Sequence, residues 1–117
     1  MKLRGERLKR CIGIDIGSWE YVEISCKKDT TLSIAANLLG HGTFNLYIMG
    51  SKDIIPAPVK GRLSGFNCKA ALWHKEATTS VIIKYKVAES GTHYIFFDNH
   101  HDELESKSID IDICITH

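Results

Sequence analysis

The residues best suited to chemistry lie together between two apolar runs near the end of the chain. They are Asp98, Asn99, His100, His101 and Asp102, and two glutamates follow them. Carboxylate and amide oxygens bind calcium and imidazole nitrogens bind zinc, so this segment is a candidate metal site. Adjacent histidines on an extended chain point in opposite directions, however, and would need a turn to share one ion. The interpretation we favour is a solvated acidic loop between two strands, with no metal and no cofactor.

Nucleophilic catalysis would need a cysteine or serine beside a base. We expect Cys26 to face inward and Cys114 to face outward, each on a strand. His74 and His93 also fall on predicted strands, where a structural role is ordinary. The sequence contains neither G-x-S-x-G nor H-E-x-x-H. We therefore predict that the protein is not an enzyme, and a small hydrolase is the third of three hypotheses below.

The elements that flank the acidic cluster are the most regular part of the sequence. Residues 108–116 place isoleucine at every second position, which predicts a strand with one buried and one wet face. Residues 81–87 alternate similarly, with Ile82 as a single exposed aliphatic side chain. Residues 94–97 are apolar throughout, which predicts a central strand covered on both faces. We expect this aromatic strand and the final strand to lie side by side and to close a core between two layers.

Four more strands are predicted in the first half of the chain. They share apolar side chains at alternate positions and cover residues 8–16, 19–26, 31–38 and 44–49. The turn at residues 27–29 is expected to join the second and third as a hairpin. A short strand over residues 69–76 brings the total to seven or eight. The sequence therefore predicts an all-β fold, an antiparallel β-sandwich of two sheets.

Residues 51–67 form a long connection that holds both prolines, Pro56 and Pro58. A structureless loop of this length is uncommon in a compact domain and is often functional. We therefore name Pro56, Pro58 and the nearby Trp73 as candidates for contact with a partner. A simple crossover between the two sheets is the alternative.

Length and composition limit the classes of protein that fit. A chain of 117 residues predicts one domain over residues 1–117. No apolar run approaches the roughly 20 residues that a membrane-spanning helix needs. The N-terminus starts like a secretory signal but lacks its apolar segment, so we expect cytoplasmic localisation. The four cysteines contain no C-x-x-C pair, so free thiols are expected, and two disulfides stay open for an oxidising compartment.

Charge is unevenly distributed along the chain, although the net charge is only +1. A basic N-terminal arm is predicted over residues 1–7, and the first ten residues hold five cations, namely Lys2, Arg4, Arg7, Lys9 and Arg10. From residue 89 to residue 112, seven acids accompany a single lysine. The cations could contact an anionic surface, or dock on the acidic end of the same or a neighbouring subunit. No aromatic residues are interleaved with them, so nucleic-acid binding is not predicted.

Three segments carry a resemblance to a known family. Residues 90–99 enter an aromatic strand through Gly91 and end in Asn99, and residues 106–113 place Ser-Lys before the alternating strand. With residues 44–48, they resemble the end of a GOLD domain, a module named for Golgi dynamics and found in cargo receptors of the early secretory pathway. The resemblance implies a β-sandwich that binds proteins. Other jelly-roll families, among them bacterial pre-peptidase C-terminal domains and carbohydrate-binding modules, end similarly.

Three functional hypotheses follow from these patterns. The first is a non-enzymatic interaction module, similar to GOLD domains, that binds a protein partner or a second copy of itself through a sheet face or the proline-containing loop. The second is a jelly-roll domain that binds carbohydrate or a metal ion, and the third is the small hydrolase. Carbohydrate binding would require Trp19, Tyr47 and Trp73 to line one exposed surface.

Overall fold

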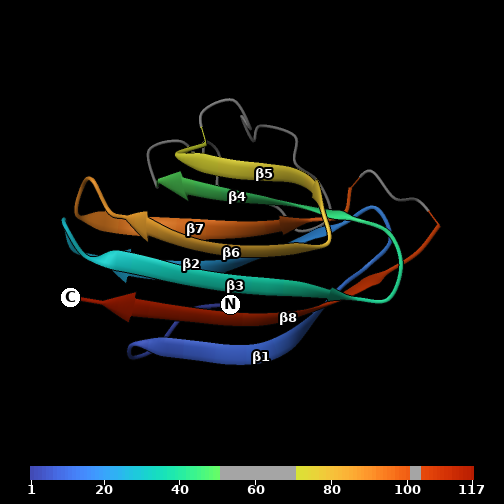
Figure 1. Cartoon of the computed structure of the whole chain (residues 1–117), viewed down its shortest axis with the longest axis horizontal. Coiled ribbons are helices and arrows are strands. Elements are labelled where there is room, and N and C mark those ends of the chain that lie inside the picture. The colour runs from blue at the N-terminus through green and yellow to red at the C-terminus, as the bar shows by residue number, and fades with distance from the viewer. Residues whose placement is uncertain (51–70, 101–103) are drawn as a thin grey trace.

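The computed structural model describes residues 1–50, 71–100 and 104–117, which form eight strands in two antiparallel sheets (Figure 1). The strands are β1 (Arg7–Ile14), β2 (Trp19–Cys26), β3 (Thr31–Leu39), β4 (Phe44–Gly50), β5 (Trp73–Thr78), β6 (Ser80–Lys86), β7 (Gly91–Asp98) and β8 (Lys107–Thr116). One sheet has the strand order β1-β8-β3-β6 and the other has β2-β7-β4-β5. The predicted all-β antiparallel sandwich is therefore confirmed.

The alternation of side chains places the core between the two sheets. The four isoleucines of β8 at positions 109, 111, 113 and 115 are all buried, and the polar residues between them face outward. On β6, Val81 is buried whereas Ile82 is 89% exposed. On β7, Ile95 and Phe97 enter the core between the sheets, while Phe96 packs on the opposite face. The predicted faces of these three strands are confirmed.

Strands that follow one another in sequence mostly lie in opposite sheets, and this makes two of our predictions wrong. β2 pairs with β7 and not with β3, so residues 19–26 and 31–38 do not form a hairpin. β7 and β8 belong to different sheets, so they do not lie side by side as neighbours. The turn after β2 crosses between the sheets, with Asp29 at φ 69° and its N–H bonded to the carbonyl of Val87 at 2.8 Å. Alternation identifies the buried face of a strand but not its neighbour.

The segment before β1 lies along the edge of β2. The N–H of Leu3 donates to the carbonyl of Glu23 at 2.9 Å, and the N–H of Glu23 donates to the carbonyl of Met1 at 2.8 Å. The ammonium of Lys2 lies 3.7 Å from the Glu23 carboxylate. The first residues thus cover part of this sheet edge.

β1 is shorter than predicted. It ends at Ile14, and the N–H of Ser18 donates to the carbonyl of Asp15 at 3.1 Å in the turn that follows. Ile16 lies in that turn and is 52% exposed, so the prediction that the strand continues to residue 16 was wrong. Because the chain leaves the sheet at Ile14, the period of two no longer decides which side chains are buried.

Membrane-spanning helices are absent from the described part of the chain.

Candidate functional site

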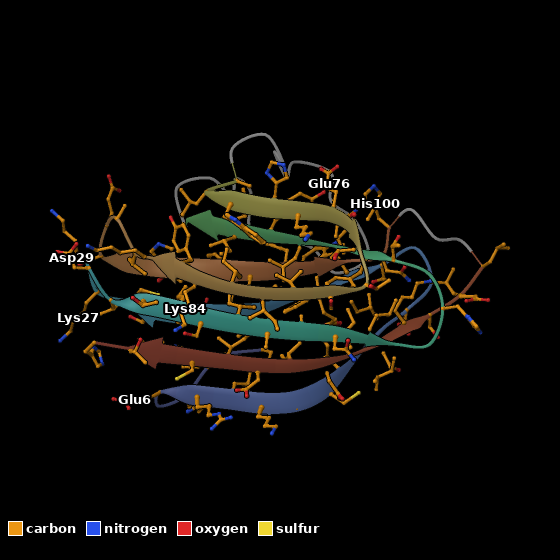
Figure 2. All side chains as sticks on the ribbon, in the orientation of Figure 1. Glu6, Lys27, Asp29, Glu76, Lys84 and His100 are labelled. Atoms are coloured by element: carbon orange, nitrogen blue, oxygen red, sulfur yellow. The ribbon has the colours of Figure 1, made fainter. Side chains whose placement is uncertain are left out.

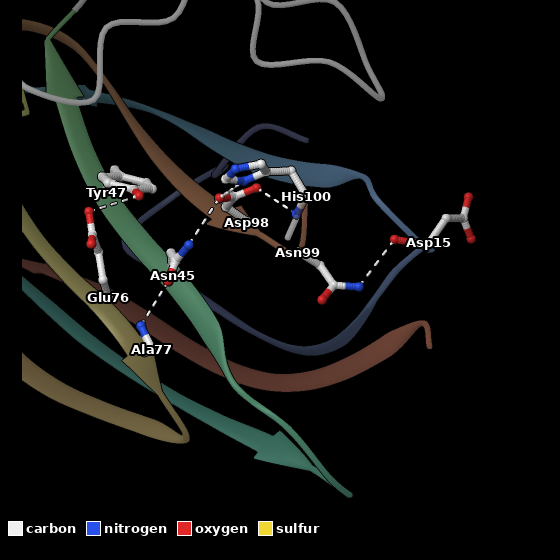
Figure 3. Close-up of polar contacts among 8 residues, drawn as sticks. All are labelled: Asp15, Asn45, Tyr47, Glu76, Ala77, Asp98, Asn99 and His100. Carbon is white, nitrogen blue, oxygen red and sulfur yellow. Dashed lines mark hydrogen bonds and ion pairs between the residues drawn. The ribbon is translucent and has the colours of Figure 1, made fainter. Parts of the chain in front are cut away.

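The end of β7 carries a buried polar cluster. It contains Asp98 and His100 of the acidic segment and also Asn45, which the sequence patterns did not single out. The Asp98 side chain is 0% exposed and accepts hydrogen bonds from the backbone N–H of His100 at 2.9 Å and from Asn45 Nδ2 at 3.2 Å (Figure 3). His100 Nδ1 also contacts the Asp98 carboxylate. Asn45 Oδ1 in turn accepts the N–H of Ala77 at 2.8 Å. This network ties β7 to β4 and to the end of β5.

Asn99 holds three segments together at the same end of the sandwich. Its Nδ2 donates to the carbonyls of Glu105 at 3.0 Å and Asp15 at 3.3 Å. Its backbone N–H donates to the carbonyl of Ser18 at 2.9 Å. Asn99 thus closes the end of β7 by bonding to backbone groups of the β1–β2 turn and of the segment before β8.

The metal candidates therefore divide into two groups. Asp98, Asn99 and His100 lie together, but the carboxylate and the amide nitrogen are already bound within the protein. His101 and Asp102 lie outside the described residues. Within residues 1–50, 71–100 and 104–117, no group of three or more His, Cys, Asp or Glu side chains is placed to hold a metal ion.

The four cysteine and histidine side chains considered for catalysis all lie on described strands. Cys26 is buried in the core, and this burial raises the pKa of its thiol to about 11. Cys114 faces outward on β8 and is half-buried. His93 is buried with Nδ1 3.1 Å from the carbonyl of Gly91, and His74 stacks on Tyr47. A thiol whose pKa is raised is a poor nucleophile at neutral pH, so Cys26 does not fit a catalytic role.

The three aromatic residues required by the carbohydrate hypothesis do not share one exposed surface. Trp19 and Tyr47 are buried on the outer face of the β2-β7-β4-β5 sheet, where Trp19 contacts Phe96 at a ring distance of 5.1 Å. Trp73 instead packs against the core between the sheets. These rings therefore do not form the platform on which a sugar would stack. Pro56 and Pro58 lie outside the described residues, and a partner contact of Trp73 stays a prediction.

Several of the N-terminal cations are engaged within the chain. Arg7 binds Asp112 through two hydrogen bonds, Nε to Oδ1 at 2.9 Å and Nη2 to Oδ2 at 2.7 Å. This contact raises the pKa of Arg7 and lowers that of Asp112. Lys9 also lies opposite Asp112 in the register of β1 and β8. The alternative in which the basic segment docks on acidic residues of the same subunit is thus supported for β1, whereas Arg4 and Arg10 are exposed.

The outer side of the β1-β8-β3-β6 sheet forms an open groove of about 510 Å³, and we call this surface the groove face. The register places Lys9, Asp112, Ala35 and Ile82 in one row across the four strands. The small side chain of Ala35 lies in the middle of this row, with the exposed Ile82 at its β6 end. The sequence indicated that these positions face outward. It did not reveal the groove, because strand order brings the four residues together.

Comparisons with solved structures find the same fold at low sequence identity. PliG of Aeromonas hydrophila, a periplasmic lysozyme inhibitor of g-type lysozyme, matches with a TM-score of 0.63 and 10% identity over 98% of this chain and 94% of that one. PliG of Salmonella Typhimurium, described in the same words, gives 0.60 and 10% over 99% and 96%. A pre-peptidase C-terminal domain of collagenase from Bacillus anthracis gives 0.55 and 10% over 93% and 90%. No protein-family model matches the chain, and no curated protein matches its sequence.

Proposed function

We propose that the protein is a non-enzymatic protein-binding module that contacts its partner through the groove face. The observation that carries the proposal is the open groove of about 510 Å³ with the 89% exposed Ile82 at its β6 end. An isoleucine this exposed loses water contact only when another molecule covers it, and apolar surface removed from water contributes about 25 cal/mol per Å² to binding. Protein interfaces commonly combine such an apolar centre with a charged rim. Here Lys9 and Asp112 provide charge in the same row.

The candidate partner class comes from the structural neighbours. PliG proteins of two bacteria share the fold over nearly the whole chain and are inhibitors of g-type lysozyme. At 10% identity this likeness supports a shared scaffold, and the partner is our proposal. A g-type lysozyme is accordingly the first protein to test.

The finer predictions from the sequence remain proposals. The strand order β1-β8-β3-β6 and β2-β7-β4-β5 supports a jelly-roll description. The GOLD-like identity is also a proposal, and it is compatible with a β-sandwich that binds proteins. Cytoplasmic localisation stays a prediction beside neighbours that are periplasmic.

The proposal is tested by binding and inhibition with a matched pair of variants. Wild-type protein, Ala35→Arg and Ser25→Arg are titrated with a g-type lysozyme by biolayer interferometry, and peptidoglycan lysis is followed in parallel. Ala35→Arg fills the groove, whereas Ser25 is an exposed residue of β2 in the other sheet. We expect Ala35→Arg to weaken binding at least tenfold and Ser25→Arg to leave it unchanged. No binding by wild-type protein would exclude this lysozyme class, and equal binding by both variants would exclude the groove face.

A further inference from the structure

The β6 edge of the groove face has features that go beyond a general docking surface. β6 is the last strand of its sheet and pairs with β3 on one side, while the strands before and after it in the chain, β5 and β7, belong to the other sheet. A strand with one unpaired side exposes backbone donors and acceptors that another extended chain can bind.

The flanking hydrogen bonds determine which backbone groups point outward. The N–H of Val87 donates to the carbonyl of Thr30, and the N–H of Leu38 donates to the carbonyl of Thr79, each at 2.9 Å. In an antiparallel pair, every second residue bonds to its partner strand. Both bonds involve odd-numbered residues, so the odd-numbered residues of β6 are those whose backbone groups bond to β3. The backbone groups of residues 82, 84 and 86 therefore point away from β3.

The same three residues also present their side chains on the groove face. Ile82, Lys84 and Lys86 are all exposed, and Lys84 is labelled in Figure 2. Within the described residues, no loop or turn forms a backbone hydrogen bond with these three residues. Ser80, at the start of the strand, differs because its N–H and carbonyl both bond to the Thr78 hydroxyl, at 3.3 and 2.7 Å. The open part of the edge thus begins at Ile82.

The charges of this edge distinguish it from β1, the opposite edge of the same sheet. On β1, Arg7 pairs with Asp112 of β8, and Lys9 lies opposite the same residue. On β6, Lys86 lies 3.9 Å from the exposed Asp29, and Lys84 has Ser33 as its neighbour on β3. A second copy of the chain would bring two further lysines to the same ribbon, which opposes self-pairing.

We propose that β6 is a strand-addition site for an extended acidic segment of the partner protein. The added segment bonds to the backbone groups of residues 82, 84 and 86, and carboxylates on its groove-face side pair with Lys84 and Lys86. Its alternate, apolar side chains extend the core beside Ile83 and Tyr85, which are half-buried at the sandwich edge. The inference rests on the proposed protein-binding function and names the binding mode and the chemistry of the partner.

The first test uses the full chain and a nine-residue peptide of alternating glutamate and valine. Binding is followed by fluorescence anisotropy at low salt, and amide hydrogen exchange is measured by NMR. We expect the amides of Ile82, Lys84 and Lys86 to exchange at least tenfold more slowly with the peptide, because they gain acceptors. A peptide with lysine in place of glutamate is expected to bind about tenfold more weakly. Absence of binding, or binding without protection of these three amides, overturns the proposal.

Two variants separate the backbone and charge contributions. Lys84→Pro removes one outward N–H without removing a bond to β3. We expect this variant to bind the glutamate peptide at least tenfold more weakly than wild type. Lys84→Glu keeps the backbone but brings the net charge of positions 84 and 86 to zero, so we expect the preference for the glutamate peptide to disappear. If Lys84→Pro does not fold, Lys84→Glu alone decides. A Lys84→Glu variant that still prefers the glutamate peptide refutes the charge complementarity.

The same variants with g-type lysozyme separate this inference from the proposed function. If lysozyme binds wild-type protein and both variants equally, the strand-addition site is wrong for that partner while the proposed function stands. If the glutamate peptide protects the three amides but lysozyme does not bind, the site stands and the partner is another protein with an extended acidic segment.

Discussion

Two isoleucines on opposite faces of one sheet give the sharpest test of the sandwich. Ile113 on β8 is 0% exposed and lies opposite Ile34 of β3 and Leu8 of β1, whereas Ile82 on β6 is 89% exposed. Ile→Ala removes three carbon atoms, which corresponds to about 2.4 kcal/mol at about 0.8 kcal/mol per buried methylene. The cavity left in a core that relaxes only partly adds to this, so we expect Ile113→Ala to lower the free energy of unfolding by about 3 kcal/mol.

Ile82→Ala is the matched control and is expected to change the free energy of unfolding by less than about 0.5 kcal/mol. Guanidinium chloride denaturation of both variants, with equal m-values, measures the difference. A thermal scan should show Ile113→Ala melting roughly 10 °C lower. Equal losses for the two variants, or a larger loss at Ile82, would refute the assignment of the two faces.

Three further predictions concern the polar and thiol groups. Asp98→Ala should destabilise the fold by about 3 kcal/mol, because it leaves buried donors unpaired, while Asp110→Ala on the exposed side of β8 should cost less than about 0.5 kcal/mol in urea denaturation. At pH 8 a thiol reagent should label the exposed Cys11 quickly and Cys26 only on unfolding, because burial raises the pKa of Cys26 to about 11. If the Cys11→Ser and Cys26→Ser variants were labelled at equal rates, this prediction would be contradicted. The Asp112 carboxyl, whose pKa is lowered by a hydrogen bond to its arginine partner, stabilises the folded state above its unfolded pKa near 3.9, and this contribution is lost as pH falls through the folded value. Asp112→Asn should therefore be less stable than wild type at pH 7, and the difference in stability should shrink as pH falls below about 3.9; a difference that does not change with pH would refute the pairing.

The sequence predicts the strands and their faces well because both depend on local pattern. The alternation in β8 gives its buried isoleucines, and the exposed Ile82 is visible from the single break in the pattern of β6. These features follow from the period of two along an extended chain, which needs no knowledge of neighbouring strands. Cys26 is assigned to the core on the same basis.

The order of the strands in each sheet could not be predicted from the sequence. A short polar turn such as residues 27–30 looks the same whether it closes a hairpin or crosses between sheets, and here it crosses. The groove face needs this order, because Ala35 and Ile82 become neighbours only when β3 pairs with β6. The buried contacts of Asp98 have the same origin, since Asn45 reaches it through the pairing of β4 with β7.

The order of the strands decides which basic residues lie beside acidic ones. On β1, Arg7 pairs with Asp112 of the neighbouring β8, whereas Arg10 is exposed. Lys84 and Lys86 of β6 lie two strands away from β8, across β3, whose outward residues beside them are uncharged. An approaching acidic segment is therefore attracted toward Lys84 and Lys86, and this attraction weakens as salt screens it beyond about 10 Å at 0.1 M. If the association rate of the glutamate peptide does not change between 20 mM and 500 mM salt, charge does not direct binding to this edge.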